Sequence, residues 1–298
     1  MLNFHTLDVF TTTPYAGNPL AVVLNADALT TAQMQTIARE FNLSETLFVQ
    51  QPDDPAHTAK VRIFFPTAEI PFAGHPTIGC AILLAENQFD GDFETEITLE
   101  EVAGLVPVSV SRKGNDIQAE FTAPVIPYAL DVKAPDPETL ASGLNLPVAG
   151  IGFDDHAFGI FEGGPNFAYI PVASIDALSR AKIGSGWEAL TKQIGTNSAY
   201  VYTRTETGYA ARMFSPGDGI PEDPATGSAS AIFAAQLLAS GDLREGTNNF
   251  HLEQGVDMGR PSQIKLSIDL EDSKITAIRI AGTAVRISHG TLETLPSR

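Results

Sequence analysis

The strongest constraint on the fold of this chain is a pattern that occurs twice, half a chain apart. Arg, Phe, Pro, Ile and Pro in the segment Arg62–Pro76 recur 150 residues later in Arg212–Pro224. With a slip of two residues, His75 aligns with Asp223. A period of half of the 298 residues is too long for a solenoid and suits a duplicated domain. We therefore expect two related domains, with the functional site where they meet.

The composition supports two folded cores and argues against several classes of protein. Apolar residues make up 43% of the chain, which is enough to build a core in each half. The net charge of -18 would repel nucleic acid, and no Lys/Arg cluster offsets it. The single cysteine, Cys80, excludes an internal disulfide and a zinc site made of several thiolates. A reducing compartment fits this usage.

No targeting or membrane signal is evident. The start, Met1–Asp8, has neither a basic region nor the apolar stretch of a signal peptide. No run approaches the roughly 20 apolar residues that a membrane span needs. We expect a soluble, cytoplasmic protein that binds neither membranes nor nucleic acid.

Each half reads as strands followed by one apolar helix. In the first half, strands are predicted at 2–9, 20–24, 46–50, 59–65, 94–99, 105–112 and 116–122, with helices at 31–41 and 77–85. In the second half, strands are predicted at 167–172, 199–203 and 208–214, with helices at 187–194 and 229–239. The proline-rich stretch 124–137 separates the halves, and 275–289 is strand-like. The expected domains are 1–124, with 284–298 returning to it, and 125–283.

The two late helices have almost no polar face, so each must be buried. The simplest burial is inside a sheet that curls around the helix. The predicted fold is therefore α+β, with two homologous domains related by a pseudo-twofold axis, each a mixed sheet or barrel around a central apolar helix. His75 and Asp223 each precede a proline, and we expect them to cap the two helices, with Gly241 closing the second.

Two helix starts facing one cleft would favour an anion, such as a substrate carboxylate. Gly74 and Gly227 would let a ligand approach backbone N–H groups, and Ser228 adds a hydroxyl, although such residues also simply make turns. His75 and Asp223 are both proton carriers, yet they differ chemically. The two copies therefore appear asymmetric at the point where a reaction would occur.

A third candidate, Glu45, stands between a predicted helix and a predicted strand, where the second half carries Asn197. Only one copy keeps a carboxylate there. On its own, Glu45 is equally compatible with a solvated loop residue or a helix cap.

Taken together, these motifs resemble the PhzF family of phenazine-biosynthesis-like isomerases, which share the fold of diaminopimelate epimerase. The resemblance runs through nearly the whole chain. Its motifs are Asp8–Phe10 with Gly17–Pro19, Asn42–Thr46, Pro71–Pro76, Asp223–Ala229 and Gln254–Gly255 with Met258–Ser262.

The resemblance implies a cofactor-free active site between two homologous domains. It implies Glu45 as the main acid/base, with His75 and Asp223 as its partners. In the family's characterised isomerase, a proton moves between carbons of a hydroxylated cyclohexadiene acid and the resulting enol becomes a ketone. The residues implied to bind the substrate are Ser44, Gly74, Gly227, Ser228 and, more weakly, Asn18. The implied partners are a small carboxylate-bearing substrate and a second copy of the chain in a homodimer.

Three other classes of protein compete with this interpretation. A racemase or epimerase of the same fold normally uses two cysteines, and Cys80 is alone and lies within an apolar helix. A non-catalytic binding protein could retain the fold, but Glu45, His75 and Asp223 are all present. A metal enzyme is disfavoured because the six histidines show no ligand spacing. The substrate itself stays open.

Overall fold

The computed structural model describes residues 1–297, apart from the side chain of Asp218. The chain divides into two compact units, one of Met1–Thr122 with Ile280–Arg298 and one of Ala123–Arg279. The boundaries expected from the sequence, 124 and 284, lie two and four residues further along the chain. The second unit is thus an insertion within the first.

The first unit is a mixed sheet with two helices, α1 (Thr31–Phe41) and α2 (Gly74–Gln88), and a short 3-10 helix, η1 (Ala26–Ala28). Its strands are β1 (Leu2–Val9), β2 (Asn18–Val23), β3 (Glu45–Gln50), β4 (Ala59–Phe64), β5 (Glu69–Ile70), β6 (Phe93–Glu101), β7 (Gly104–Lys113), β8 (Asp116–Thr122) and β18 (Ala284–Leu292). Strand β17 (Lys274–Gly282) runs from the second unit into the first.

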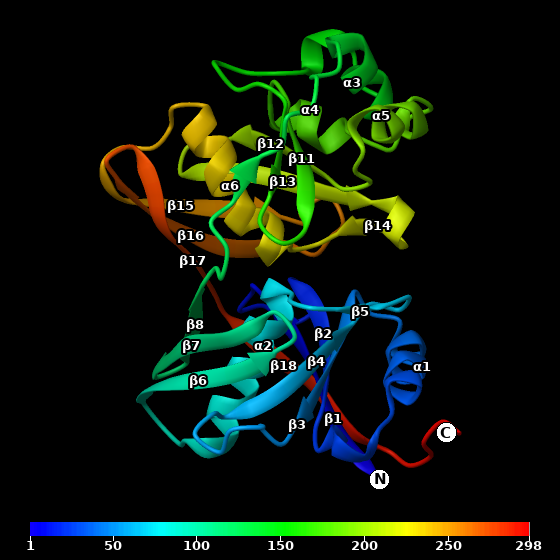
Figure 1. Ribbon diagram of the computed structural model, residues 1–298, viewed down its shortest axis with the longest axis vertical. Helices are drawn as coiled ribbons and strands as arrows, with labels where there is room; N and C mark the ends of the chain where they lie inside the picture. Colours follow the sequence, from blue (N-terminus) through cyan, green and yellow to red (C-terminus); the bar gives the residue numbers. More distant parts are fainter. Residues whose placement is uncertain (298) are drawn as a thin grey trace. The chain divides into compact units, whose positions relative to one another are not determined.

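The sheet of the first unit curves around α2. Strand β1 lies between β18 and β2, and the order continues through β3, β4, β6, β7 and β8. The pairs β2–β3 and β4–β6 are parallel and the others are antiparallel, while β5 pairs with the end of β4. Helix α2 contacts strands from both ends of this order and its middle, so the strands surround it (Figure 1). Eleven of its 15 residues are buried.

The second unit contains β9 (Tyr128–Ala129), β10 (Gly159–Glu162), β11 (Asn166–Pro171), β12 (Ala199–Arg204), β13 (Gly208–Ser215), β14 (Ile220–Asp223), β15 (Gly246–Gln254) and β16 (Ser262–Glu271). Its helices are α3 (Pro137–Gly143), α4 (Ile175–Arg180), α5 (Trp187–Ile194) and α6 (Gly227–Ala239), with 3-10 helices η2 (Val148–Gly150) and η3 (Pro216–Asp218).

The strand order of the second unit repeats that of the first. From β10 it runs through β11, β12, β13, β15 and β16, with β11–β12 and β13–β15 parallel and the other pairs antiparallel. The short β14 pairs with β13 as β5 pairs with β4. The apolar α6 packs on β10, β11 and β16, and ten of its 13 residues are buried. The predicted fold class is confirmed, since each unit is a mixed sheet around one apolar helix.

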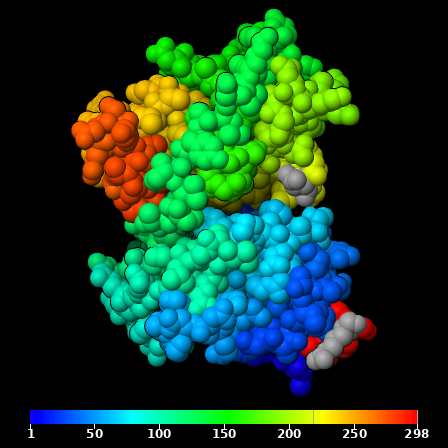
Figure 2. Space-filling view, viewed as in Figure 1, coloured from blue at the N-terminus to red at the C-terminus, as the bar shows by residue number. Residues whose placement is uncertain are grey.

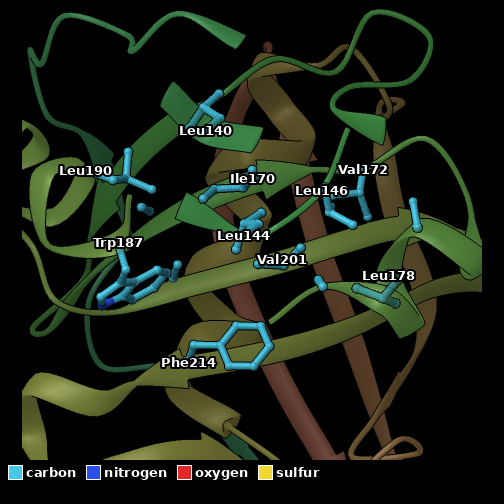
Figure 3. Close-up of a cluster of buried hydrophobic side chains, with 14 of the residues drawn as sticks. Leu140, Leu144, Leu146, Ile170, Val172, Leu178, Trp187, Leu190, Val201 and Phe214 are labelled. Carbon is cyan, nitrogen blue, oxygen red and sulfur yellow. The ribbon is translucent and has the colours of Figure 1, made fainter. Parts of the chain in front are cut away.

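A second layer of helices covers the other face of each sheet. In the second unit, side chains of α3, α4 and α5 point toward the sheet and form one buried cluster (Figure 3). Trp187 and Leu190 of α5 lie there with Ile170, Val201 and Phe214 of the strands. In the first unit, α1 packs on β3 and β4, and η1 packs on β3. The described C-terminal residues lie beside it (Figure 2), where Gln33 of α1 donates a hydrogen bond of 2.7 Å to the Pro296 carbonyl.

Most predicted elements are confirmed, and several with the expected bounds, including the helices at 31–41 and 187–194. The C-terminal segment 275–289 proves to be two strands, and β18 returns to pair with β1. Gly241, at a φ of 77°, follows the end of α6 as expected. No helix within residues 1–297 has the length and apolar character to cross a membrane.

The predicted helix caps are wrong. Helix α2 begins at Gly74 with Ala73 as its N-cap, so His75 lies inside the first turn. Helix α6 begins at Gly227 with Thr226 as its N-cap, so Asp223 lies before the helix, at the end of β14. Neither helix start has a side-chain cap hydrogen bond.

Strand register shows that the two units correspond at two different offsets. Arg62 lies opposite Phe48 in the first unit, and Arg212 lies opposite Val201 in the second. The two arginines are therefore 150 residues apart in the sequence, whereas their partners are 153 apart. Ile63 pairs with Ile70, whereas Met213 pairs with Asp223. The offset of 150 therefore applies to β4 and β13, and 153 applies on both sides of them. The recurring Ile-Pro dipeptides do not occupy equivalent places.

Candidate functional site

Glu45 is the first residue of β3 and is 7% exposed. Side chains along a strand alternate between its faces, so Glu45 shares a face with Leu47 and Val49. This is the face toward α2, because Phe48, on the opposite face, belongs to the cluster that packs under α1. The chain thus places a carboxylate at the end of a strand, among apolar side chains.

His75 is the second residue of α2 and is 2% exposed. Burial lowers the pKa of its imidazole from 6.5 to about 3, so the ring is neutral at physiological pH. Its Nε2 lies 3.4 Å from Oε2 of Glu45, and its Nδ1 lies 3.2 Å from Nδ2 of Asn18. Asn18, the first residue of β2, is fully buried.

These three side chains fix the tautomer of the histidine. The Asn18 amide nitrogen can only donate, so it donates to Nδ1 and the ring proton lies on Nε2. The Nε2–H group then faces the Glu45 carboxylate. Within residues 1–297, Nε2 has no hydrogen bond of good geometry. The first unit therefore holds a carboxylate and a neutral imidazole side by side, with the imidazole orientation set by an amide.

Ser44 and Gly74 adjoin this group in the chain. Ser44 is half-buried in the turn that leads into β3, next to Glu45. Gly74 is the buried first residue of α2, so its N–H belongs to the first turn, where backbone donors have no partner within the helix. The structure thus brings five of the predicted site residues to one end of the first unit: Asn18, Ser44, Glu45, Gly74 and His75.

The other three predicted residues belong to the second unit. Asp223 is 5% exposed, and the hydroxyl of Thr226 donates to its Oδ2 at 2.5 Å. Gln254, at the end of β15, donates to Thr226 Oγ1 at 3.0 Å and to the Asp223 carbonyl at 2.7 Å. Gly227 is the buried first residue of α6, and Ser228, next to it, is half-buried.

The expected correspondence between His75 and Asp223 is wrong. At the offset of 153 residues, His75 corresponds to Ser228, since both are second in their helices. Asp223 corresponds to Ile70. Glu45 corresponds to Ser198 rather than to Asn197. The two units therefore differ more at their helix starts than the sequence alignment indicated, because each contributes its carboxylate from a different element.

Two polar residues that orient the predicted site stand in motifs of the sequence analysis but are not among its predicted site residues. Thr226 and Gln254 are 8% and 0% exposed and connect to Asp223 through hydrogen bonds. Gln254 lies in phase with the buried Leu252 along β15, and this alternation was the available signal. Among the described residues, no group of three or more His, Cys, Asp or Glu side chains is placed to hold a metal ion.

Comparison with known proteins gives consistent matches over the whole chain. The family model for phenazine biosynthesis-like protein (PhzC-PhzF) matches residues 7–290. An uncharacterized isomerase of Mesorhizobium japonicum is 42% identical, covering 97% of this chain and 98% of its own. The trans-2,3-dihydro-3-hydroxyanthranilate isomerase of Pseudomonas fluorescens is 33% identical, covering 98% and 99%.

A solved structure agrees with these relatives. The PhzF-family phenazine biosynthesis protein of Bacillus anthracis superposes with a TM-score of 0.84 at 25% identity, covering 97% of this chain and 98% of its own. The matched range includes every predicted site residue. The chain therefore belongs to the phenazine biosynthesis-like (PhzF) family, and its relatives place it among the isomerases.

Proposed function

We propose that this protein is a cofactor-independent isomerase that moves a proton between carbons of a small carboxylic acid. Glu45 takes the proton from one carbon, and the electron pair of the broken C–H bond shifts through an adjacent double bond. Glu45 then returns the proton to a carbon at the far end. His75 of the first unit and Asp223 of the second unit assist it. Positioned acid/base groups of this kind contribute about 10²–10⁴-fold to a rate.

The observation that carries this proposal is the buried contact between Glu45 and His75. The Glu45 carboxylate is 7% exposed and lies 3.4 Å from a neutral imidazole, at the end of a strand whose neighbouring side chains on that face are apolar. Asn18 holds the ring in one orientation. A carboxylate in such a site can act as a base on carbon, because its burial keeps bulk water away from its lone pairs.

The first turns of α2 and α6 supply the proposed carboxylate-binding groups. Gly74, Gly227 and Ser228 stand at these helix starts, where N–H groups point outward and the helix dipole favours negative charge. Developing negative charge on the substrate would be stabilised by the same fixed donors. The relative from Pseudomonas fluorescens is named for trans-2,3-dihydro-3-hydroxyanthranilate, a hydroxylated, unsaturated amino acid. We propose that class of substrate for this chain.

The test is hydrogen exchange into the substrate. Purified protein is incubated in D₂O with trans-2,3-dihydro-3-hydroxyanthranilate and a panel of unsaturated or hydroxylated acids, and deuterium at carbon is followed by NMR. Glu45→Gln should slow incorporation by about 10²–10⁴-fold. The matched control is Glu40→Gln, an exposed carboxylate on α1 that should leave the rate unchanged. Binding without exchange across the panel would instead identify a non-catalytic binding protein.

A two-thiol racemase mechanism is not supported by the position of the single cysteine. Cys80 is fully buried within α2, and burial raises the pKa of its thiol far above the usual range. It therefore serves as a small apolar residue. Epimerisation through carboxylates would appear in the same assay as exchange at one carbon without migration of the double bond.

A further inference from the structure

Glu101 is a buried carboxyl group that the proposed reaction does not use. It is the last residue of β6, is 8% exposed, and lies in phase with the buried Ile97 and Leu99, on the face toward α2. Its Oε1 is 2.7 Å from the hydroxyl oxygen of Thr77 in the first turns of α2. That hydroxyl oxygen is also 2.8 Å from the carbonyl oxygen of Ala73, the N-cap of the helix.

The count of hydrogens in this cluster favours a proton on Glu101. A threonine hydroxyl has a single hydrogen, so Thr77 can donate fully to only one of its two neighbours. If Glu101 is ionised, one of the two short contacts of the Thr77 oxygen joins two acceptors with no hydrogen between them. If Glu101 carries a proton, it donates to Thr77 and Thr77 donates to Ala73, so both contacts are hydrogen bonds. Within residues 1–297, the second oxygen of Glu101 has no partner, which disfavours a full charge there.

The second unit shows a related connection with a residue that donates at every pH. Its hydroxyl stands at a different place, since Thr226 is the N-cap of α6 whereas Thr77 lies within α2. Gln254 stands 153 residues after Glu101 and occupies the same place in the sheet. Glu101 ends the strand β6 that pairs in parallel with β4, and Gln254 ends the strand β15 that pairs in parallel with β13. Its amide donates to Thr226 at 3.0 Å. Thr226 in turn donates to Asp223 at 2.5 Å. In each unit an interior donor thus reaches a hydroxyl, and that hydroxyl reaches an acceptor at the helix start.

We propose that Glu101 is a positioning residue that works as a neutral carboxylic acid, holding the start of α2 so that His75 faces Glu45. It does for His75 what Gln254 does for Asp223. The difference is that glutamine donates at every pH, whereas glutamate donates only while protonated. The start of the first unit's central helix therefore contains a proton-dependent support that the second unit lacks.

The backbone around Glu101 explains how this support reaches His75. The turn after β6 holds the segment that leads into α2, because the Ala103 N–H donates to the Pro71 carbonyl at 3.0 Å. Glu101, through Thr77, holds Ala73 at the other end of that segment. His75 follows two residues later. A change at Glu101 therefore moves the entry of the helix on which His75 sits.

The environment of Glu101 favours its neutral form. Burial raises the pKa of this carboxyl from 4.5 to about 8, and the Thr77 hydrogen bond lowers it less. The titratable group that interacts with it from α2 is Cys80, whose thiol pKa Glu101 helps to raise. The inward residues of β4 and β7 are apolar, such as Val61 and Val106. Among the described residues no cation contributes to the pKa of Glu101, so the proton stays until mildly alkaline pH.

The experiment follows His75 directly and needs no substrate. In protein labelled with ¹⁵N-histidine, the His75 ring resonances should shift with an inflection near pH 8 as Glu101 loses its proton. Glu101→Gln should abolish that inflection, while the ring keeps the shifts that it has at neutral pH. Glu96→Gln, an exposed carboxylate on the same strand, is the control and should leave the inflection in place.

Activity then gives a second, separate readout, which rests on the proposed function. Glu101→Gln should keep kcat near the wild-type value at pH 7 and extend it to higher pH. Glu101→Ala should lower kcat about 10²-fold with little change in KM, as expected for a small misplacement of a reacting group. In the reverse substitution, Gln254→Glu should make the hydrogen bonds that connect residue 254 to Thr226 and Asp223 depend on pH as well.

The outcomes separate the two proposals. If the inflection of the His75 resonances near pH 8 persists in Glu101→Gln, the proposed role of Glu101 is wrong, whatever the enzyme's activity. A titration that Glu101→Gln abolishes, in a protein with no exchange activity on any acid, would support Glu101 and count against the proposed function instead.

Discussion

At the scale of single residues, the imidazole of His75 lies in an environment very different from water. Its ring is 2% exposed, and its contacts are an amide and a carboxylate rather than solvent. The sequence could single out Glu45 and His75, because each stands at the edge of an apolar element. It could not show that Asn18 lies beside His75, because 57 residues separate them and only the packing of β2 on α2 brings them together.

The buried histidine makes stability depend on pH below neutrality. The folded protein keeps His75 neutral down to about pH 3, whereas the unfolded chain takes up a proton near 6.5. The stability that His75 contributes is therefore complete above pH 6.5 and is lost as pH falls toward 3. Between pH 7.5 and 5.5 we expect a loss of about 1.4 kcal/mol from this residue. His156, whose pKa is also lowered by burial, adds to it in the same direction.

Urea unfolding at the two pH values measures this loss. His75→Gln should remove about 1.4 kcal/mol of the pH dependence. His251→Gln, which replaces an exposed histidine on β15, should leave the dependence as it is. An identical pH dependence in wild type and His75→Gln would show that the ring is not kept neutral.

At the level of elements, local signals predicted the structure well and repeated dipeptides did not. The helices at 31–41 and 187–194 have amphipathic spacing with local end signals, Thr30 at one start and Gly195 at one end, so their bounds followed from the sequence. Helix α3 was missed because its proline-rich flank was interpreted as a linker, although Asp136 caps it. Strands β5 and β14 are too short for an alternating pattern to show.

The misassigned correspondence between the units has a physical cause. By register, the β12–β13 connection is three residues shorter than the β3–β4 connection, and the β13–β14 connection is three residues longer than the β4–β5 one. Loop lengths change freely because loops lie on the surface. The true correspondence is shown instead by bidentate ion pairs that both units form, Arg62 with Glu69 and Arg212 with Glu222.

These two equivalent ion pairs should differ in their importance for stability. The Arg212 side chain is 9% exposed and also donates to the carbonyls of Leu178, Ser179 and Ala181. The Arg62 side chain is 20% exposed. Arg212→Met should lower the free energy of unfolding by about 3–5 kcal/mol, because it leaves the half-buried Glu222 carboxylate and three carbonyls without their donor. Arg62→Met should cost about 1 kcal/mol or less.

Chemical denaturation of the two variants, compared with wild type, decides the point. Because the two substitutions are chemically identical, each serves as the control for the other. Equal losses of unfolding free energy in the two variants would mean that burial of the ion pair does not determine its contribution to stability.

At the scale of the whole molecule, both ends of the chain belong to the first unit. Strand β18 pairs with β1 along its length, from Leu2 opposite Leu292 to Val9 opposite Ala284. The first unit is therefore completed by residues on both sides of the second. The second unit has its own central helix and its own buried cluster.

Removing β18 should affect the two units differently. A chain that ends at residue 283 leaves β1 with only β2 as a neighbour among the strands of its own unit. We expect limited proteolysis to cleave the first unit rapidly, while fragments of the second persist. A chain that ends at Leu292 keeps β18 and is the matched control. Uniform resistance in the shorter chain would contradict this expectation.

The pairing of β1 with β18 also sets the order in which the protein matures during synthesis. Strand β1 must wait for β18, while residues 123–279 are made in between, which takes roughly 10–30 s. Through that interval β1 is an open edge, the kind of surface that invites pairing with other chains. The second unit can close first. The nascent chain thus carries an unfinished first half, and the exposed edge of β1 is covered only once β18 has been made.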